Sequence, residues 1–173
     1  GDQSNLATAI GGMSYGVSVT ENTAAFSTFA NMGEYKKPYI VDEIRDHNDK
    51  IIYKAEVNPT RVYQEATSYL ILNMLNDVIN ASYGIAPDIA SGLRFSSKNL
   101  FVKTGTSEYY KDLWVVGGTK NITLGTWTGY DKPATVPNYT YGHKTWLHLM
   151  NAIYTYDSKL VSPDTAFEKP NSV

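Results

Sequence analysis

Three stretches of the chain carry apolar residues at helical spacing: Val19–Met32, Gln64–Ala81 and Lys144–Tyr154. The first follows Ser18, which opens a Ser-Val-Thr-Glu pattern typical of a helix N-terminus. Gly33 stands where such a helix would end. The second stretch has apolar residues on more than one side. We therefore expect three helices, the second of them largely buried.

Shorter apolar runs predict strands before and after the second helix. Tyr39–Ile44 and Lys50–Glu56 flank a polar Asp-His-Asn-Asp cluster, which predicts a hairpin. Three further runs follow: Asn99–Thr106, Asp112–Gly117 and Ile122–Tyr130. Their short connections favour antiparallel pairing. The middle run is apolar on both faces, as in a central strand that is covered on each side.

The remaining segments lack a clear period. Leu6–Val17 is glycine-rich and predicts a tight, partly buried passage, whereas Ile85–Arg94 and Asp131–Tyr141 are interpreted as loops. Ser158–Val173 is polar and contains proline, so we interpret it as a C-terminal tail. Helices combined with an antiparallel sheet predict an α+β layered domain, with the sheet flanked by helices.

Composition narrows the function classes. The chain has 173 residues, of which 42% are hydrophobic and 18% charged, and a net charge of −2, which fits one globular domain. No basic stripe is present, so we expect no nucleic-acid partner. The absence of cysteine excludes disulfides and thiolate metal sites. The start, Gly1–Ser4, looks like a cut end, and we expect the chain to be a piece of a longer protein.

The most informative chemistry lies in Lys103-Thr104-Gly105-Thr106, the KTGT string. In a strand, Lys103 and Gly105 share one face while Thr104 and Thr106 share the other. A glycine inside a strand is typical of close approach by a ligand or another backbone. With a cation and two hydroxyls beside it, the string predicts one edge of a cleft for a ligand that carries a carboxylate.

The wider context resembles the C-terminal half of the transpeptidase domain of class A, bifunctional penicillin-binding proteins. The matching features are Ala9-Ile10-Gly11-Gly12 with Tyr15-Gly16-Val17-Ser18, the helix that ends in Ala30-Asn31-Met32-Gly33, and the KTGT string followed by Asp112-Leu113-Trp114-Val115-Val116-Gly117. The resemblance spans about Leu6 to Ile153. It implies that residues 1–157 are the C-terminal portion of that domain and that residues 158–173 form a tail.

The superfamily has three sequence boxes, S-x-x-K, S-x-N and K-T-G. The chain contains no S-x-x-K. Ser97-Lys98-Asn99 fits S-x-N by its letters, but it stands too close to the KTGT strand, so we interpret it as a chance match. The serine nucleophile and its lysine are therefore expected on an upstream segment or a separate chain, and this chain alone should not acylate. We also expect the central strand to pair with strands outside this chain.

The resemblance implies a peptidoglycan D,D-transpeptidase that works through an acyl-serine intermediate and is acylated by β-lactams. In that family the KTG lysine, here Lys103, aids proton movement and attracts the substrate carboxylate. Thr104 and Thr106 would bond that carboxylate, and the Thr106 backbone N–H would be one oxyanion donor. Gly105 would allow the helix of the nucleophile to approach the strand. These four residues are the expected catalytic group.

Other residues are weaker candidates. Ser107 and Tyr109 lie in the turn after the strand and are expected, with Thr104 and Thr106, to contact the stem peptide. Trp114 is interpreted as core, whereas Trp127 fits either core or ligand platform. The three histidines, His47, His143 and His148, are too scattered for a metal site or a triad.

The resemblance also implies the setting. No cofactor or metal is expected, and the partners are the N-terminal part of the same protein with the S-x-x-K and S-x-N boxes, peptidoglycan stem peptides and β-lactams. The expected location is the extracytoplasmic face of the bacterial membrane, with the parent protein membrane-anchored and this chain soluble. Two alternatives remain open: a non-catalytic scaffold of the same fold, and a D,D-carboxypeptidase or β-lactamase relative.

Overall fold

A three-stranded antiparallel sheet organises the body of the protein. The computed structural model describes residues 5–173, so the interpretation of Gly1–Ser4 lies outside the described residues. The sheet has the order β5-β6-β7 and consists of β5 (Phe101–Thr106), β6 (Asp112–Gly118) and β7 (Thr123–Gly129). The strands, their antiparallel pairing and the central place of β6 confirm the predicted sheet.

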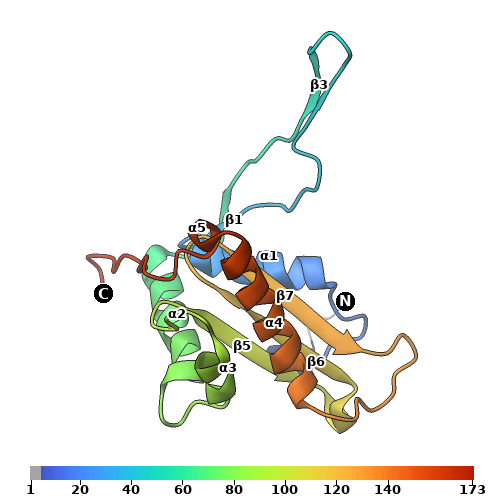
Figure 1. Ribbon diagram of the computed structural model, residues 1–173, viewed down its shortest axis with the longest axis vertical. Coiled ribbons are helices and arrows are strands. Elements are labelled where there is room, and N and C mark those ends of the chain that lie inside the picture. The colour runs from blue at the N-terminus through green and yellow to red at the C-terminus, as the bar shows by residue number, and fades with distance from the viewer. Residues whose placement is uncertain (1–4) are drawn as a thin grey trace.

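Helices cover both faces of the sheet (Figure 1). The described α-helices are α1 (Val19–Ala30), α2 (Glu65–Asn80), α3 (Pro87–Gly92), α4 (Thr140–Tyr156) and α5 (Ser158–Val161), and two short 3-10 helices are η2 (Leu6–Ile10) and η3 (Glu108–Tyr110). On one face, α1 packs on β7 and α2 packs on β5. On the other, α4 packs on β6 and β7. The helix-flanked antiparallel sheet confirms the predicted α+β fold.

Two hydrophobic clusters follow from the strand alternation, because neighbouring residues of a strand point to opposite faces. Phe101 packs with Leu72 and Leu75 of α2 on one face. Val102, the next residue, packs with Trp146 of α4 on the other. The apolar run of β6 predicted burial on both faces, and its neighbouring residues Val115 and Val116 are indeed both buried. Such burial fixes the register of the strands.

The first helix begins as its sequence predicts and ends at Ala30, two residues before the predicted end at Met32. The Ser18 hydroxyl accepts a hydrogen bond from the Glu21 backbone N–H at 3.2 Å, and the Glu21 carboxylate accepts one from the Ser18 backbone N–H at 2.8 Å. Gly33 follows the helix with φ of +96°, a left-handed conformation that favours glycine. A side chain there would lie 2.1 Å from the Tyr63 carbonyl oxygen, so this passage depends on glycine.

The segment between α1 and α2 projects from the body as a long ribbon (Figure 1). The predicted hairpin is confirmed as β2 (Glu43–Arg45) and β3 (Ile51–Lys54), although its strands are shorter than expected. A second pair was not predicted: β1 (Glu34–Tyr35) with β4 (Thr60–Arg61). Two-residue strands carry no periodicity that a sequence pattern can reveal.

Several local predictions were wrong. Residues 85–94, interpreted as a loop, contain α3, whose Pro87 sits in the first turn where its missing N–H costs nothing. Leu6–Val17 was expected to be partly buried, yet Leu6 and Ile10 are about nine-tenths exposed. The second helix is buried on one side only, because Leu70 and Met74 are at least half exposed.

The central strand pairs on both sides with strands of this chain, which contradicts the expectation of outside partners for β6. The free edges of the sheet are instead those of β5 and β7 within the described residues. The segment after α4 packs on the body: Val161 is fully buried and its carbonyl accepts a hydrogen bond from the Thr119 hydroxyl. Phe167 packs on Phe101, with ring centroids 6.1 Å apart.

Candidate active site on the edge strand

The KTGT string forms the last four of the six residues of β5, an edge strand of the sheet. The first two residues of β5, Phe101 and Val102, are fully buried, whereas Lys103 and Thr106 are exposed. The strand is therefore anchored in the core at its start and presents its polar residues at its end. The sequence predicts this change from buried to exposed residues, because two apolar residues precede the polar string.

The backbone of the string offers hydrogen-bonding groups along its free edge. The Ser107 N–H donates to the Asp112 carbonyl oxygen at 3.0 Å, so this pair is a hydrogen-bonded one. In an antiparallel ladder such pairs alternate with pairs whose N–H and C=O groups point away from the partner strand. Thr106 and Thr104 are the alternate residues, and their N–H and C=O groups therefore face outward.

Lys103 lies along this same edge. Its Nζ donates a hydrogen bond of 2.6 Å to the Thr104 carbonyl oxygen, which agrees with the outward direction of that carbonyl. Within residues 5–173, none of the salt bridges involves Lys103. The ammonium group is thus exposed, uncompensated by an acidic side chain and close to the outward-facing backbone.

The face that Lys103 and Gly105 share is partly open. Gly105 pairs with Trp114, which in turn pairs with Trp127, and all three are half-buried. A Cβ at Gly105 would meet the Trp114 Cβ at 3.3 Å, a contact tighter than most. Trp114 and Trp127 thus form an aromatic surface beside the string and lie between core and solvent.

The turn after the string is built around Asp112, a residue that sequence reasoning missed. The Ser107 hydroxyl donates to one Asp112 carboxylate oxygen at 2.8 Å and accepts a bond from the Asp112 backbone N–H at 2.9 Å. The Trp127 indole N–H donates to the other oxygen at 3.0 Å. Ser107 therefore supports the turn, and its hydroxyl proton is already engaged.

Two consecutive tyrosines in this turn adopt left-handed backbone conformations. Tyr109 and Tyr110 have φ of +58° and +55°, which non-glycine residues rarely adopt. Tyr109 is 72% exposed, with the Lys111 ammonium 5.6 Å from its ring centroid. The Tyr110 ring lies 6.0 Å from that of Tyr139. Nothing in the local sequence indicates this conformation.

The structure brings together the predicted residues Lys103, Thr104, Gly105 and Thr106 on one strand, with Ser107 and Tyr109 in the adjoining turn. Their roles stay predictions. The two residues that fit S-x-N by their letters join parts of the fold instead. The Ser97 hydroxyl donates to the Asn80 side-chain oxygen, and the Asn99 amide donates to the Pro163 carbonyl. Of the histidines, His143 contacts Asp88 at 2.9 Å and joins α4 to α3.

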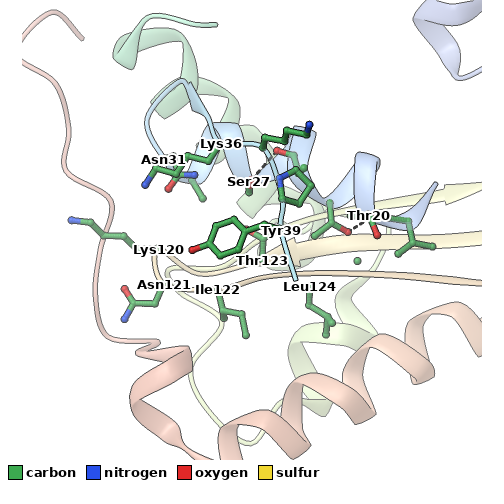
Figure 2. Close-up of a pocket in the computed structure, with 17 residues that line it drawn as sticks. Thr20, Ser27, Asn31, Lys36, Tyr39, Lys120, Asn121, Ile122, Thr123 and Leu124 are labelled. Atoms are coloured by element: carbon green, nitrogen blue, oxygen red, sulfur yellow. Dashed lines mark hydrogen bonds between the residues drawn. The ribbon is translucent and has the colours of Figure 1, made fainter. Parts of the chain in front are cut away.

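A cavity of about 590 Å³ lies elsewhere, between α1, residues 36–39 and the start of β7. Figure 2 shows the Tyr39 ring over this cavity, with its hydroxyl directed toward the side where Lys120 and Asn121 lie. No KTGT residue lines it, and one strand, β6, lies between β5 and β7, the strand that lines it. The exposed edge, and not this cavity, carries the predicted chemistry.

Comparisons with known proteins all point to one family. The family model described as penicillin binding protein transpeptidase domain matches residues 2–160. Penicillin-binding protein 4 of Bacillus subtilis is 30% identical over 131 residues, covering 76% of this chain and 20% of that protein. Penicillin-binding protein 1F of the same species is 33% identical, covering 73% of this chain and 18% of that protein. The chain thus spans about a fifth of these relatives.

Solved structures show the same fold. Penicillin-binding protein 1A from Haemophilus influenzae matches with a TM-score of 0.67 and 22% identity, over 79% of this chain and 26% of that one. The D,D-transpeptidase domain of a peptidoglycan glycosyltransferase from Eggerthella lenta matches with a TM-score of 0.63 and 19% identity, over 82% of this chain and 33% of that one.

Proposed function

The chain belongs to the penicillin-binding protein transpeptidase family, and from this membership we propose that it supplies the KTGT strand of a peptidoglycan D,D-transpeptidase. The parent protein, meaning the longer polypeptide in which we place this chain, would cross-link stem peptides through an acyl-serine intermediate. It would also be acylated by β-lactams. The serine nucleophile belongs to an upstream segment or a separate chain that carries the S-x-x-K and S-x-N boxes.

One observation carries the proposal: a lysine with no acidic partner among residues 5–173 and the outward-facing backbone of Thr104 and Thr106 lie together on a free strand edge. An extended peptide can align with such an edge, because main-chain hydrogen bonds give it both affinity and direction. The Lys103 ammonium would attract the terminal carboxylate of that peptide. The Thr104 and Thr106 hydroxyls would bond it from the other side of the strand.

The chemistry has two steps. In the first, the serine hydroxyl oxygen attacks the carbonyl carbon of the peptide bond before the last D-alanine. The C–N bond breaks, the serine proton passes to the leaving amine, and D-alanine departs. In the second, an amine of a neighbouring stem attacks the ester. The C–O bond breaks, the serine regains a proton and a new amide forms.

The edge strand contributes electrostatic stabilisation to both steps. The tetrahedral intermediates carry negative charge on the former carbonyl oxygen, and the outward Thr106 N–H would donate to it. Removing one such donor costs about 10²–10³ in rate in other enzymes. The Lys103 ammonium also favours negative charge nearby and, with the S-x-N serine, would assist movement of the proton.

The wider setting belongs to the same proposal. The parent protein would act at the extracytoplasmic face of the bacterial membrane, held there by an anchor, and would carry a glycosyltransferase module as class A proteins do. None of the helices described in residues 5–173 is long and apolar enough to cross a membrane. Cross-linking by the parent protein would support cell shape, and its reaction with β-lactams would link it to antibiotic resistance.

Penicillin labelling of the parent protein tests the proposal. A transpeptidase should gain one covalent penicillin and transfer a stem peptide to an amine acceptor. Labelling followed by hydrolysis without transfer would favour a carboxypeptidase or β-lactamase. A parent protein that gains no adduct would be a scaffold of the same fold.

A further inference from the structure

The geometry points to a saccharide-binding surface beside the KTGT strand. We propose that Tyr109, Tyr110 and Tyr139, here named the tyrosine platform, stack against pyranose rings of the glycan strand that carries the stem peptide. The inference rests on the proposed function, because it assigns a second part of the same substrate to the same end of the sheet.

The platform is exposed, and its composition is unusual. Within residues 86–148, the exposed large hydrophobic residues are all tyrosines: Tyr109, Tyr110, Tyr130, Tyr139 and Tyr141. A membrane-binding surface would also expose Trp, Phe or Leu. The projecting hairpin, by contrast, exposes aliphatic residues, including Ile44 and Ile52. Of these two exposed regions, only the one that contains the platform is restricted to tyrosine.

The topology gathers these tyrosines at one end of the sheet. Tyr109 and Tyr110 follow β5, and Tyr130 follows β7, whose last residue Gly129 pairs with Asp112 at the start of β6. Tyr139 directly precedes α4. The Tyr110 carbonyl accepts a hydrogen bond from the Val136 N–H at 3.0 Å, which joins the turn to the loop before α4.

The backbone of the platform is strained without a gain in burial. Each left-handed non-glycine residue costs about 1–2 kcal/mol. Tyr109 and Tyr110 are both exposed, so packing does not repay this cost. Observed strain at exposed residues beside a reactive strand indicates a functional demand on their position.

The surrounding charges favour a neutral ligand. Glu108, Asp112 and Asp131 are negative, Lys111 and Lys132 are positive, and all lie within the turn and the loop that carry the platform. Three negative and two positive charges leave a net charge of −1, so the surface would not attract an anionic polymer. Tyrosine rings offer flat apolar faces to the C–H face of a pyranose, and their hydroxyls bond its hydroxyl and amide groups.

The test uses the parent protein and a probe that lacks any peptide. The probe is the β-1,4-linked tetrasaccharide of N-acetylglucosamine, and the readout is saturation-transfer NMR on its ring protons. We expect binding to the parent protein and at least about tenfold weaker binding to a Tyr110→Ala, Tyr139→Ala double variant. Phenylalanine at both positions should restore most of the affinity, because stacking survives.

Tyr156→Ala is the matched control. This tyrosine is 87% exposed and lies at the opposite end of α4, so binding should stay as in the parent protein. An unchanged melting temperature shows that the variants are folded. Unaltered binding by the double variant, or no binding of the tetrasaccharide by the parent protein, would overturn the inference. A parent protein that gains a penicillin adduct but ignores the sugar would refute the platform and leave the transpeptidase intact.

Discussion

The Lys103 ammonium donates a 2.6 Å hydrogen bond to the carbonyl oxygen of the next residue, Thr104. In the absence of a ligand, the lysine thus bonds a carbonyl of its own strand, and this local hydrogen bond occupies the free edge of β5. Hydrogen bonds to charged groups contribute only about 1.5–3 kcal/mol, and the exchange for a carboxylate replaces one such bond with another. The lysine can therefore turn to a ligand at little cost.

Replacing Lys103 should impair acylation more than it impairs folding. In the parent protein, Lys103→Ala should slow penicillin acylation by about 10²–10³, because one electrostatic contact with the reacting group is lost. The side chain is exposed, so the melting temperature should stay within about 2 °C. Lys98→Ala, an exposed lysine just before the strand, is the control. Equal rates for the two variants would remove Lys103 from the mechanism.

The capping box predicts a pH dependence of stability. The backbone N–H and the hydroxyl of Ser18 bond the Glu21 carboxylate and hold its pKa below the ordinary value of 4.5. Because the folded pKa is the lower one, the stabilisation is present above pH 4.5 and is lost as pH falls through the folded pKa.

Glu21→Gln should therefore lower the melting temperature by about 2 °C at pH 7. The difference in melting temperature between the variant and the unsubstituted protein should shrink as the pH is lowered below 4.5, where Glu21 itself becomes protonated. Calorimetry at several pH values measures the melting temperatures of the two proteins. A difference that grows toward acid pH would contradict the assigned direction of the pKa shift.

Gly33 should tolerate no side chain. Gly33→Ala places a Cβ 2.1 Å from the Tyr63 carbonyl oxygen, so the passage from α1 to the projecting ribbon must shift. We expect a loss of roughly 2–4 kcal/mol in the free energy of unfolding. Gly16 also has positive φ but nothing within 4 Å, and Gly16→Ala should cost only about 1 kcal/mol. Denaturant titration compares the two, and equal losses would show that the clash is relieved cheaply.

The fold was predictable where burial imposes a period. The run Leu113-Trp114-Val115-Val116 fits a strand covered on both faces, and Val115 is indeed fully buried. The start of α1 after Ser18 and its termination before Gly33 were predictable, because caps require particular side chains or conformations. The pair β1–β4 and the helix α3 were not, because two strand residues and six helix residues are too short to display periodicity.

The candidate site was predictable in its strand but not in its turn. The alternation of side chains along a strand is enough to place Lys103 and Gly105 on one face. The central role of Asp112 arises from bonds to Ser107, five positions earlier, and to Trp127, fifteen positions later. Such contacts depend on tertiary register, and nothing in the local pattern encodes them.

Relieving the strain at Tyr109 should stabilise the protein. Asparagine tolerates the left-handed region better than tyrosine, and the Tyr109 ring is largely exposed. Tyr109→Asn should raise the free energy of unfolding by about 1 kcal/mol, measured by urea titration. Lys132→Asn, an exposed substitution in the nearby loop, is the neutral control. A loss of stability would mean that the ring contributes more than its exposure indicates.

Intact mass of the purified protein, before and after penicillin treatment, tests the central claim most directly. We predict one penicillin adduct, carried by a polypeptide segment with an S-x-x-K box and not by residues 1–173 of this chain, which contain none. Peptide mapping then locates the modified serine. An adduct on a serine of this chain would contradict the account, as would a parent protein that gains no adduct at all.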